Sequence, residues 1–290
     1  MLSSILAVTW NPDPVIFSLG ALSVRWYGLL YASGFLIAIK LLEKMFKHER
    51  APENWIEKVF IYIVLAVIVG ARLGHVFFYA WDYYSVHPVE IFKIWEGGLA
   101  SHGGTIAMLI VAWLLSHFMI KQNMFWLGDR LFVPSALMAC MIRLGNLMNS
   151  EIYGTPTNAP WGFIFVRGGE KFFDVQGNLL PCHPTQLYEG GAYLLLFALL
   201  WILYWRYNAG KYNGLLAGIG FVWVFTARFL IEFIKNDQEA FEAGMIINMG
   251  QWLSIPFILL GIGLIVRALK KGAVEYHLPQ PSGKPTPKGK

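Results

Sequence analysis

Long apolar stretches separated by short polar segments dominate the pattern of this 290-residue chain. A run of about 18 or more apolar residues is long enough to cross the hydrocarbon of a bilayer as one helix. Such runs start near Trp26, Trp55, Ala100, Leu131, Gln186, Leu215 and Met249. The pattern predicts an all-α membrane protein with seven transmembrane helices, in one polytopic domain that covers residues 1–276.

Two segments depart from this pattern. Residues 149–184 form the longest stretch between runs and are rich in glycine, proline and aromatic residues, which predicts a small cap outside the membrane. Residues 277–290 contain mainly proline, glycine and lysine and too few apolar side chains to pack. We expect this second segment to be a disordered tail.

The lysines and arginines predict the orientation of the spans, because basic residues are retained on the cytoplasmic side of a membrane. Most of them fall in alternate loops and in the tail: Lys40, Lys44, Lys47, Arg50, Lys58, Lys121, Arg130, Arg206, Lys211, Arg267, Lys270, Lys271, Lys284, Lys288 and Lys290. The N-terminus is therefore expected outside and the C-terminus inside, which makes the cap periplasmic.

Composition supports a lipid environment and narrows the partners. Hydrophobic residues make up 56% of the chain and charged residues 14%, more apolar than the surface of a soluble domain allows. The formal net charge is +5. Basic loops beside anionic lipid headgroups account for that charge, so membrane lipids are expected partners and a nucleic acid is not.

Arg72, Arg143 and Arg228 fall within the predicted spans. A charged side chain at the bilayer centre costs about 2.5 kcal/mol or more unless it meets a partner or water. Arg228 has Glu232 one helical turn ahead, so an intrahelical ion pair and a functional role are both open for it.

Arg143 has a different neighbourhood. Its nearest same-face neighbours, Asn146 and Asn149, are neutral amides, and the next carboxylate along the chain is that of Glu151. A guanidinium on an amide-lined face is typical of an anion receptor and matches a phosphate in two-point geometry.

His102 lies where the third predicted span begins, followed by Gly103 and Gly104. The positive end of a helix disfavours a charge on its ring, and a neutral imidazole can accept a proton from a thiol. The two glycines would let a headgroup approach the backbone. The alternative is a hydrogen-bonded histidine at a helix start with a glycine hinge. Tyr27 falls at the outer edge of the first span, where aromatic residues form a belt.

Other chemistry has no pattern to support it. The seven histidines lack the spacing of a zinc site, and a phosphate-cradling glycine loop is not present in the sequence. We therefore expect no metal and no nucleotide. Cys140 falls in an apolar run and Cys182 in an outward loop, which predicts buried packing for Cys140 and no disulfide between them.

Several segments together resemble the prolipoprotein diacylglyceryl transferase family. The segment from Arg143 to Glu151, Arg-Leu-Gly-Asn-Leu-Met-Asn-Ser-Glu, resembles the signature of that family. The similarity extends, in order and spacing, over about residues 11–270, and includes segments 25–28, 70–74, 95–98, 101–104, 183–189, 228–233 and 249–251.

The resemblance implies an enzyme of the bacterial inner membrane that moves a diacylglyceryl group from phosphatidylglycerol to the lipobox cysteine of a prolipoprotein signal peptide. Glycerol phosphate would leave and a thioether would form, without a cofactor, in the first step of lipoprotein maturation. A multi-span transporter and another phospholipid-dependent transferase are the alternative functions.

The resemblance also suggests roles for individual residues. Arg143 and Arg228 would stabilise the leaving phosphate, and Tyr27 and His102 would lie near the attacking sulfur. The thiol proton could pass to His102, or the thiol could ionise beside an arginine.

Other residues would bind or orient the headgroup: Arg72, Gly103, Gly104, Asn146, Glu151 and Glu232. The chain departs from the family at Ser150, where glycine is common, and at Val224, where a tyrosine is common, so the role of that tyrosine is in doubt here.

Overall fold

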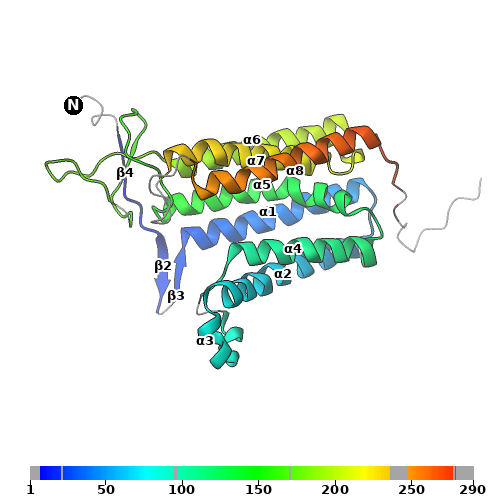
Figure 1. The fold of residues 1–290 in the computed structure, drawn as a ribbon, viewed down its shortest axis with the longest axis horizontal. Helices are drawn as coiled ribbons and strands as arrows, with labels where there is room; N and C mark the ends of the chain where they lie inside the picture. The colour runs from blue at the N-terminus through cyan, green and yellow to red at the C-terminus, as the bar shows by residue number, and fades with distance from the viewer. Residues whose placement is uncertain are drawn as a thin grey trace, which may run out of the picture. The chain divides into compact units, whose positions relative to one another are not determined.

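The computed structural model describes residues 7–20, 22–94, 97–169, 171–235, 247–276 and 278, and within these the protein is mostly helical (Figure 1). Two compact units make up the chain. The first contains Met1–Leu41 and Leu131–Val274, and the second contains Leu42–Arg130 and Glu275–Lys290. Of the predicted tail 277–290, the structure describes only Leu278. The prediction that this tail is disordered therefore lies outside the described residues.

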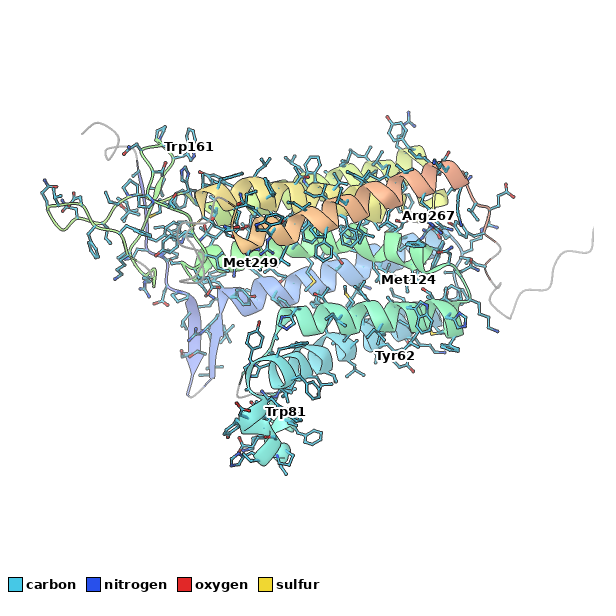
Figure 2. The ribbon with its side chains drawn as sticks, viewed as in Figure 1. Tyr62, Trp81, Met124, Trp161, Met249 and Arg267 are labelled. Atoms are coloured by element: carbon cyan, nitrogen blue, oxygen red, sulfur yellow. The ribbon has the colours of Figure 1, made fainter. Side chains whose placement is uncertain are left out.

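The helices of the first unit run side by side (Figure 1). Their bounds are α1 (Trp26–His48), which continues into the second unit, α5 (Met124–Met148), which begins there, α6 (Thr185–Tyr207), α7 (Leu215–Ile231) and α8 (Met249–Lys271). Short turns η5 (Ala209–Lys211) and η6 (Glu232–Ile234) flank α7. Figure 2 shows Met249 and Arg267 at opposite ends of α8.

Glycines and one tryptophan fix the packing of these helices. A β-carbon on Gly218 would lie 2.9 Å from the carbonyl oxygen of Gly261, so α7 and α8 approach backbone to backbone. Between α6 and α7, the indole N–H of Trp223 donates to the carbonyl oxygen of Ala192 at 2.8 Å. In lipid the hydrophobic effect does not drive helices together, so close packing of small residues and interhelical hydrogen bonds usually stabilise their association.

The second unit contains α2 (Asn54–Tyr79), α3 (Trp81–Val86), η2 (Pro88–Phe92), α4 (Ser101–Leu114) and a π-helical turn η4 (Leu115–Ile120). Gly70, Gly74 and Gly103 let α2 and α4 cross closely. A β-carbon on Gly74 would lie 2.7 Å from the Cα of Gly103. The described backbone thus leaves no room for a side chain at this crossing.

A buried arginine organises one end of the second unit. Arg130 is only 1% exposed, and its Nη2 lies 2.7 Å from Oε1 of Glu49. Its guanidinium lies 4.5 Å from the ring centre of Trp126 and 5.4 Å from that of Tyr276. Burial in this cluster raises the pKa of the Tyr276 phenol to about 12. Tyr276 therefore anchors the segment after α8 on the Arg130–Glu49 ion pair and the ring of Trp126.

Six helices of the described residues are long and apolar enough to cross a membrane. They are α2, α4 with η4, α5, α6, α7 with η6, and α8. The first predicted span does form a helix of 23 residues, α1, but α1 is not among the six. Charged residues occupy its last third, at Lys40, Glu43, Lys44 and Lys47. Six helices long and apolar enough to span a membrane are thus present among the described residues, and the seventh span stays a prediction.

Helix α5 begins at Met124, seven positions before the predicted start at Leu131. The apolar run stops at Asp129 and Arg130, which the sequence pattern assigns to a loop. The helix continues through them, and Glu49 compensates the charge of Arg130.

Residues 149–169 and 171–184 form a largely irregular segment at the end of α5, as Figure 1 shows beside the label β4 (Phe163–Phe165). Strand β1 (Val8–Trp10) pairs in parallel with β4, so the N-terminal segment joins this fold. A small core of Leu147, Tyr153, Phe165 and Cys182 holds it to α5. Strands β2 (Val15–Leu19) and β3 (Leu22–Arg25) form a separate antiparallel hairpin.

Candidate functional site

Polar side chains gather where α5 ends, within the first unit. The guanidinium Nη1 of Arg143 donates to Oδ1 of Asn146 at 3.3 Å, and Nδ2 of Asn146 donates to Oε1 of Glu151 at 2.8 Å. Asn149 also donates to that Glu151 oxygen, at 3.2 Å. Arg143 thus contacts its same-face neighbour Asn146, whereas Asn149 contacts the carboxylate rather than the guanidinium.

The backbone after α5 reverses sharply to place Glu151. Ser150 has φ 53°, in the left-handed region that favours glycine, and it is 1% exposed. The Glu151 N–H donates to the Asn146 carbonyl oxygen at 3.1 Å, and Gln186 of α6 donates to the Glu151 carbonyl oxygen at 2.7 Å. The left-handed turn therefore returns the Glu151 carboxylate to the amides of α5.

Glu189 of α6 supplies a carboxylate that sequence reasoning did not assign to the site. Its Oε2 forms an ion pair with Nε of Arg143, and its Oε1 lies 2.9 Å from the Nζ of Lys235. The Glu189 side chain is 2% exposed and that of Lys235 is 5% exposed, while that of Arg143 is 21% exposed. Arg143 is thus the most accessible charge of the three. A carboxylate inside an apolar run was the signal available in the sequence.

Lys235 follows η6 and also lies 3.8 Å from Oε2 of Glu232. Gly250 makes room for that carboxylate, since a β-carbon there would lie 2.8 Å from the Cδ of Glu232. The sequence left an intrahelical ion pair between Arg228 and Glu232 open. This pair does not form in the part of the chain that the structure describes. In that same part, the buried Nε of Arg228 has no hydrogen-bond partner.

Two tyrosines lie beside Arg143. The ring of Tyr27 lies against Gly145, one residue before Asn146. The hydroxyl of Tyr193, from α6, lies close enough to Arg143 to interact with it electrostatically. Sequence reasoning gave Tyr193 no role. Val224 stands where the resemblance leads one to expect a tyrosine. The neighbouring Phe225 has no hydroxyl to replace that of the tyrosine, and its ring stacks on Phe257 of α8 with ring centres 4.4 Å apart.

Arg72 and His102 belong to the second unit. Arg72 is 3% exposed, and its guanidinium donates to the carbonyl oxygens of Glu90 at 2.6 Å, Ile91 at 2.8 Å and Gly97 at 2.7 Å. Arg72 therefore organises the chain between α3 and α4. Its headgroup contact stays a prediction.

His102 is exposed, in the first turn of α4, and its ring lies 5.3 Å from that of Phe78 and 5.5 Å from that of Tyr79. Gly103 and Gly104 are buried and pack against α2, where Gly104 faces the carbonyl oxygen of Val67. This packing is a role that the sequence did not indicate, and their approach to a headgroup stays a prediction.

Cys140 and Cys182 are both buried, and neither forms a disulfide. Within the described ranges, histidine, cysteine and carboxylate side chains form no group of three or more that could hold a metal ion.

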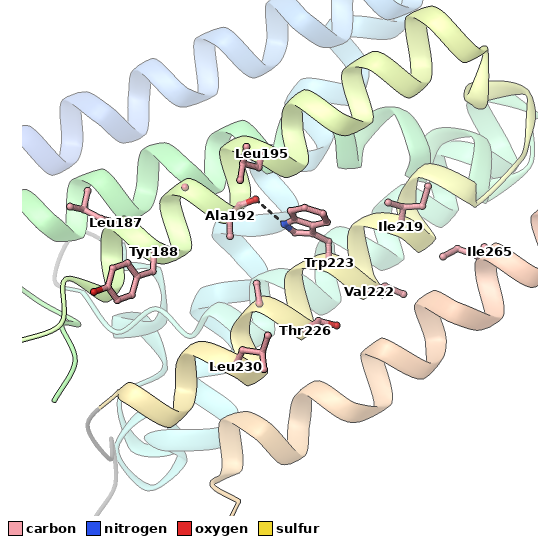
Figure 3. A pocket seen from close by; sticks show the side chains of 12 residues that line it. Leu187, Tyr188, Ala192, Leu195, Ile219, Val222, Trp223, Thr226, Leu230 and Ile265 are labelled. Atoms are coloured by element: carbon pink, nitrogen blue, oxygen red, sulfur yellow. Dashed lines mark hydrogen bonds between the residues drawn. The ribbon is translucent and has the colours of Figure 1, made fainter. Parts of the chain in front are cut away.

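An apolar groove of about 720 Å³ runs along the contact of α6 and α7. Figure 3 shows Tyr188 toward one end of it and Ile265 of α8 toward the other, with the Trp223–Ala192 hydrogen bond between. Tyr188 accepts a hydrogen bond from the indole N–H of Trp161 at 2.8 Å, and its hydroxyl lies 3.2 Å from Nδ1 of His183. Partial burial lowers the pKa of His183.

Comparisons with known proteins identify a family that matches most of the chain. A family model described as prolipoprotein diacylglyceryl transferase matches residues 14–267. The phosphatidylglycerol–prolipoprotein diacylglyceryl transferase of Porphyromonas gingivalis is 49% identical over 91% of this chain and 95% of its own length.

Proteins of the same name from two further organisms are similar. That of Chloroherpeton thalassium is 44% identical over 92% of this chain and 97% of its own length. That of Tolumonas auensis is 45% identical over 91% of this chain and 98% of its own length. The chain therefore belongs to the prolipoprotein diacylglyceryl transferase family.

Proposed function

We propose that this protein transfers the diacylglyceryl group of phosphatidylglycerol to the lipobox cysteine of prolipoprotein signal peptides, in the bacterial inner membrane. Family membership supports the reaction class. The observation that carries the proposal to a site is the Arg143 guanidinium, partly exposed among buried charges and held by Glu189 and Asn146. Such a fixed cation in an apolar environment suits an anionic headgroup.

The reaction places definite demands on the site. A bond forms between the cysteine sulfur and the glycerol carbon, while the bond from that carbon to the phosphate oxygen breaks. The electron pair leaves with glycerol phosphate, and the thiol proton passes to a base or to solvent. Negative charge grows on the leaving phosphate, and preorganised donors in low dielectric stabilise it most.

We assign leaving-group stabilisation to Arg143 and Arg228. Asn146, Glu151 and Glu232 would orient the guanidinium or the headgroup, and Tyr27 would flank the reacting centre. His102, Gly103, Gly104 and Arg72 would contact the lipid headgroup. The proton acceptor is either His102 or a base outside the protein.

The membrane arrangement is part of the proposal. α1 would be the seventh span, with the N-terminus outside, the C-terminus inside and residues 149–184 as a periplasmic cap. The six apolar helices and the basic loops support this arrangement.

Purified full-length protein can test the function directly. It would be mixed with phosphatidylglycerol vesicles and a lipobox peptide, and the peptide mass and released glycerol phosphate would be measured. We expect a peptide heavier by one diacylglyceryl group, and no product with phosphatidylethanolamine vesicles or a Cys→Ser peptide.

Two other outcomes would overturn the proposal. Lipid consumption without peptide modification would indicate another phospholipid-dependent transferase. Movement of solute across the vesicle without any covalent product would indicate a transporter.

A further inference from the structure

We propose that Lys235 is a positioning residue that neutralises Glu189, so that the charge of Arg143 remains available to the phosphate of the lipid. The inference rests on the proposed function, because it concerns the binding of the anionic donor. Lys235 would not contact the lipid itself. It would act through Glu189 on Arg143.

The geometry divides the two oxygens of Glu189 between two cations. Oε2 pairs with the Nε of Arg143, and Oε1 pairs with the Nζ of Lys235 at 2.9 Å. The contact through Nε orients the guanidinium, and Nη1 reaches Asn146 at 3.3 Å. Glu189 therefore fixes how Arg143 points, while Lys235 occupies the far side of the same carboxylate.

The burial of Glu189 makes a second cation important. At 2% exposure the carboxylate has almost no water to solvate it, and a buried charge without compensation is costly. If Arg143 were the sole partner of Glu189, the carboxylate would cancel the charge of the arginine. An arriving phosphate would then meet a neutral pair beside a carboxylate. With Lys235 in place, the three side chains together carry one positive charge.

The chain around Lys235 holds its amine in that position. Its backbone forms a β-bridge with Gly154, and the Thr155 N–H donates to the carbonyl oxygen of Ile234 at 2.9 Å. The side chain is 5% exposed, compared with 21% for Arg143. The amine is thus enclosed, and the guanidinium is the group that a ligand can reach.

Glu232 does not replace Glu189 as the main partner of Lys235. Its Oε2 lies 3.8 Å from the amine, beyond hydrogen-bonding distance. The stronger contact of Lys235 is therefore with the carboxylate that also holds Arg143, which is the reason for assigning its effect to that arginine.

The test compares four full-length variants with the wild type in vesicles of varied phosphatidylglycerol content. They are Lys235→Met, Lys235→Arg, the double variant Glu189→Gln/Lys235→Met, and the control Lys171→Met, which removes an exposed lysine of the cap. Measured quantities are kcat and KM for phosphatidylglycerol, KM for the peptide, and thermal stability.

We expect Lys235→Met to lower kcat/KM for phosphatidylglycerol by about thirtyfold or more, mainly through KM, because one partner of a buried charge pair is lost. KM for the peptide should change little. Lys235→Arg should restore most of the loss. The double variant should bind the lipid better than Lys235→Met, because it also removes the carboxylate that would cancel Arg143. Lys171→Met should match the wild type.

Each contrary outcome has a distinct meaning. A normal KM for phosphatidylglycerol in well-folded Lys235→Met would overturn the inference and leave the proposed function intact. If Lys235→Met does not fold, the double variant decides: a defect as large as that of Arg143→Ala would refute the role of Glu189 charge, and near-normal lipid KM would support it. Absence of product with the wild type would instead refute the proposed function.

Discussion

The ring of Tyr27 in α1 lies directly on Gly145 in α5, so closely that a β-carbon on the glycine would lie 2.8 Å from Cδ2 of the ring. Gly145 is two residues after Arg143 and one before Asn146. The contact therefore places an aromatic ring beside the polar cluster at the end of α5. It depends on the absence of a side chain at position 145.

Gly145→Ala should displace Tyr27 and lower activity by roughly tenfold or more, because small misplacements in a site are costly. The crowding should also cost about 1–3 kcal/mol of stability. Activity and thermal unfolding in detergent measure the two effects. Gly263→Ala is the matched control, since no atom lies within 4 Å of a β-carbon at that helix position. Equal activity of the two variants would contradict the proposed contact.

Arg143→Ala should abolish transfer while the protein still inserts and folds. Loss of a preorganised donor to a developing anion costs roughly 10²- to 10³-fold in rate. Arg143→Lys should remain strongly impaired, because an ammonium cannot reproduce the fork that reaches both Glu189 and Asn146. Turnover is measured with the lipobox peptide, and elution from a sizing column checks folding. Near-normal turnover would remove Arg143 from the mechanism.

Ser150→Gly should stabilise the protein by about 1 kcal/mol, since a residue with a β-carbon pays for the left-handed backbone at φ 53°. The substitution also removes a buried hydroxyl that has no hydrogen-bond partner among the described residues. A rise in thermal unfolding temperature without loss of activity is the expected result. Ser135→Gly, within α5, should be destabilising instead. A lower unfolding temperature for Ser150→Gly would show that its hydroxyl stabilises the turn.

His102→Gln separates two roles of the histidine. If the ring only positions lipid, activity should fall by a factor that is nearly independent of pH, and this is the outcome we expect. If the ring is the base, activity should fall by about 10² to 10⁴ and recover as rising pH ionises the substrate thiol directly. Initial rates from neutral to alkaline pH, compared with the wild type, distinguish the two. A steep alkaline recovery would establish the base.

The spans could be predicted from the sequence because a lipid environment leaves long apolar runs. The start of α5 could not, because the helix continues through Arg130, and the carboxylate that pairs with this arginine belongs to Glu49, 81 residues earlier. Within the site, the contact of Arg143 with Asn146 follows from helix spacing. The ion-pair partner of Arg143, Glu189, belongs to another helix, and residue spacing within one helix cannot predict a contact between two helices.

Glycine positions show the same limit. Gly103 was expected to admit a headgroup, yet its lack of a side chain is already required by the crossing with Gly74. Either role requires a glycine, so the residue type alone cannot separate them. Arg72 is similar, because a buried arginine can serve a ligand or the carbonyl groups of its own chain, and the structure gives it carbonyl groups.

The docking of Tyr276 against Arg130 and Trp126 affects where a tag can be attached. A reporter joined directly after Lys271 would delete the Tyr276 ring and uncover the buried Arg130. Poor yield from such a fusion would then reflect the loss of this contact rather than the topology of the chain. A junction after Leu278 retains the aromatic anchor. There we expect a cytoplasmic signal, and a periplasmic one would reverse the proposed orientation.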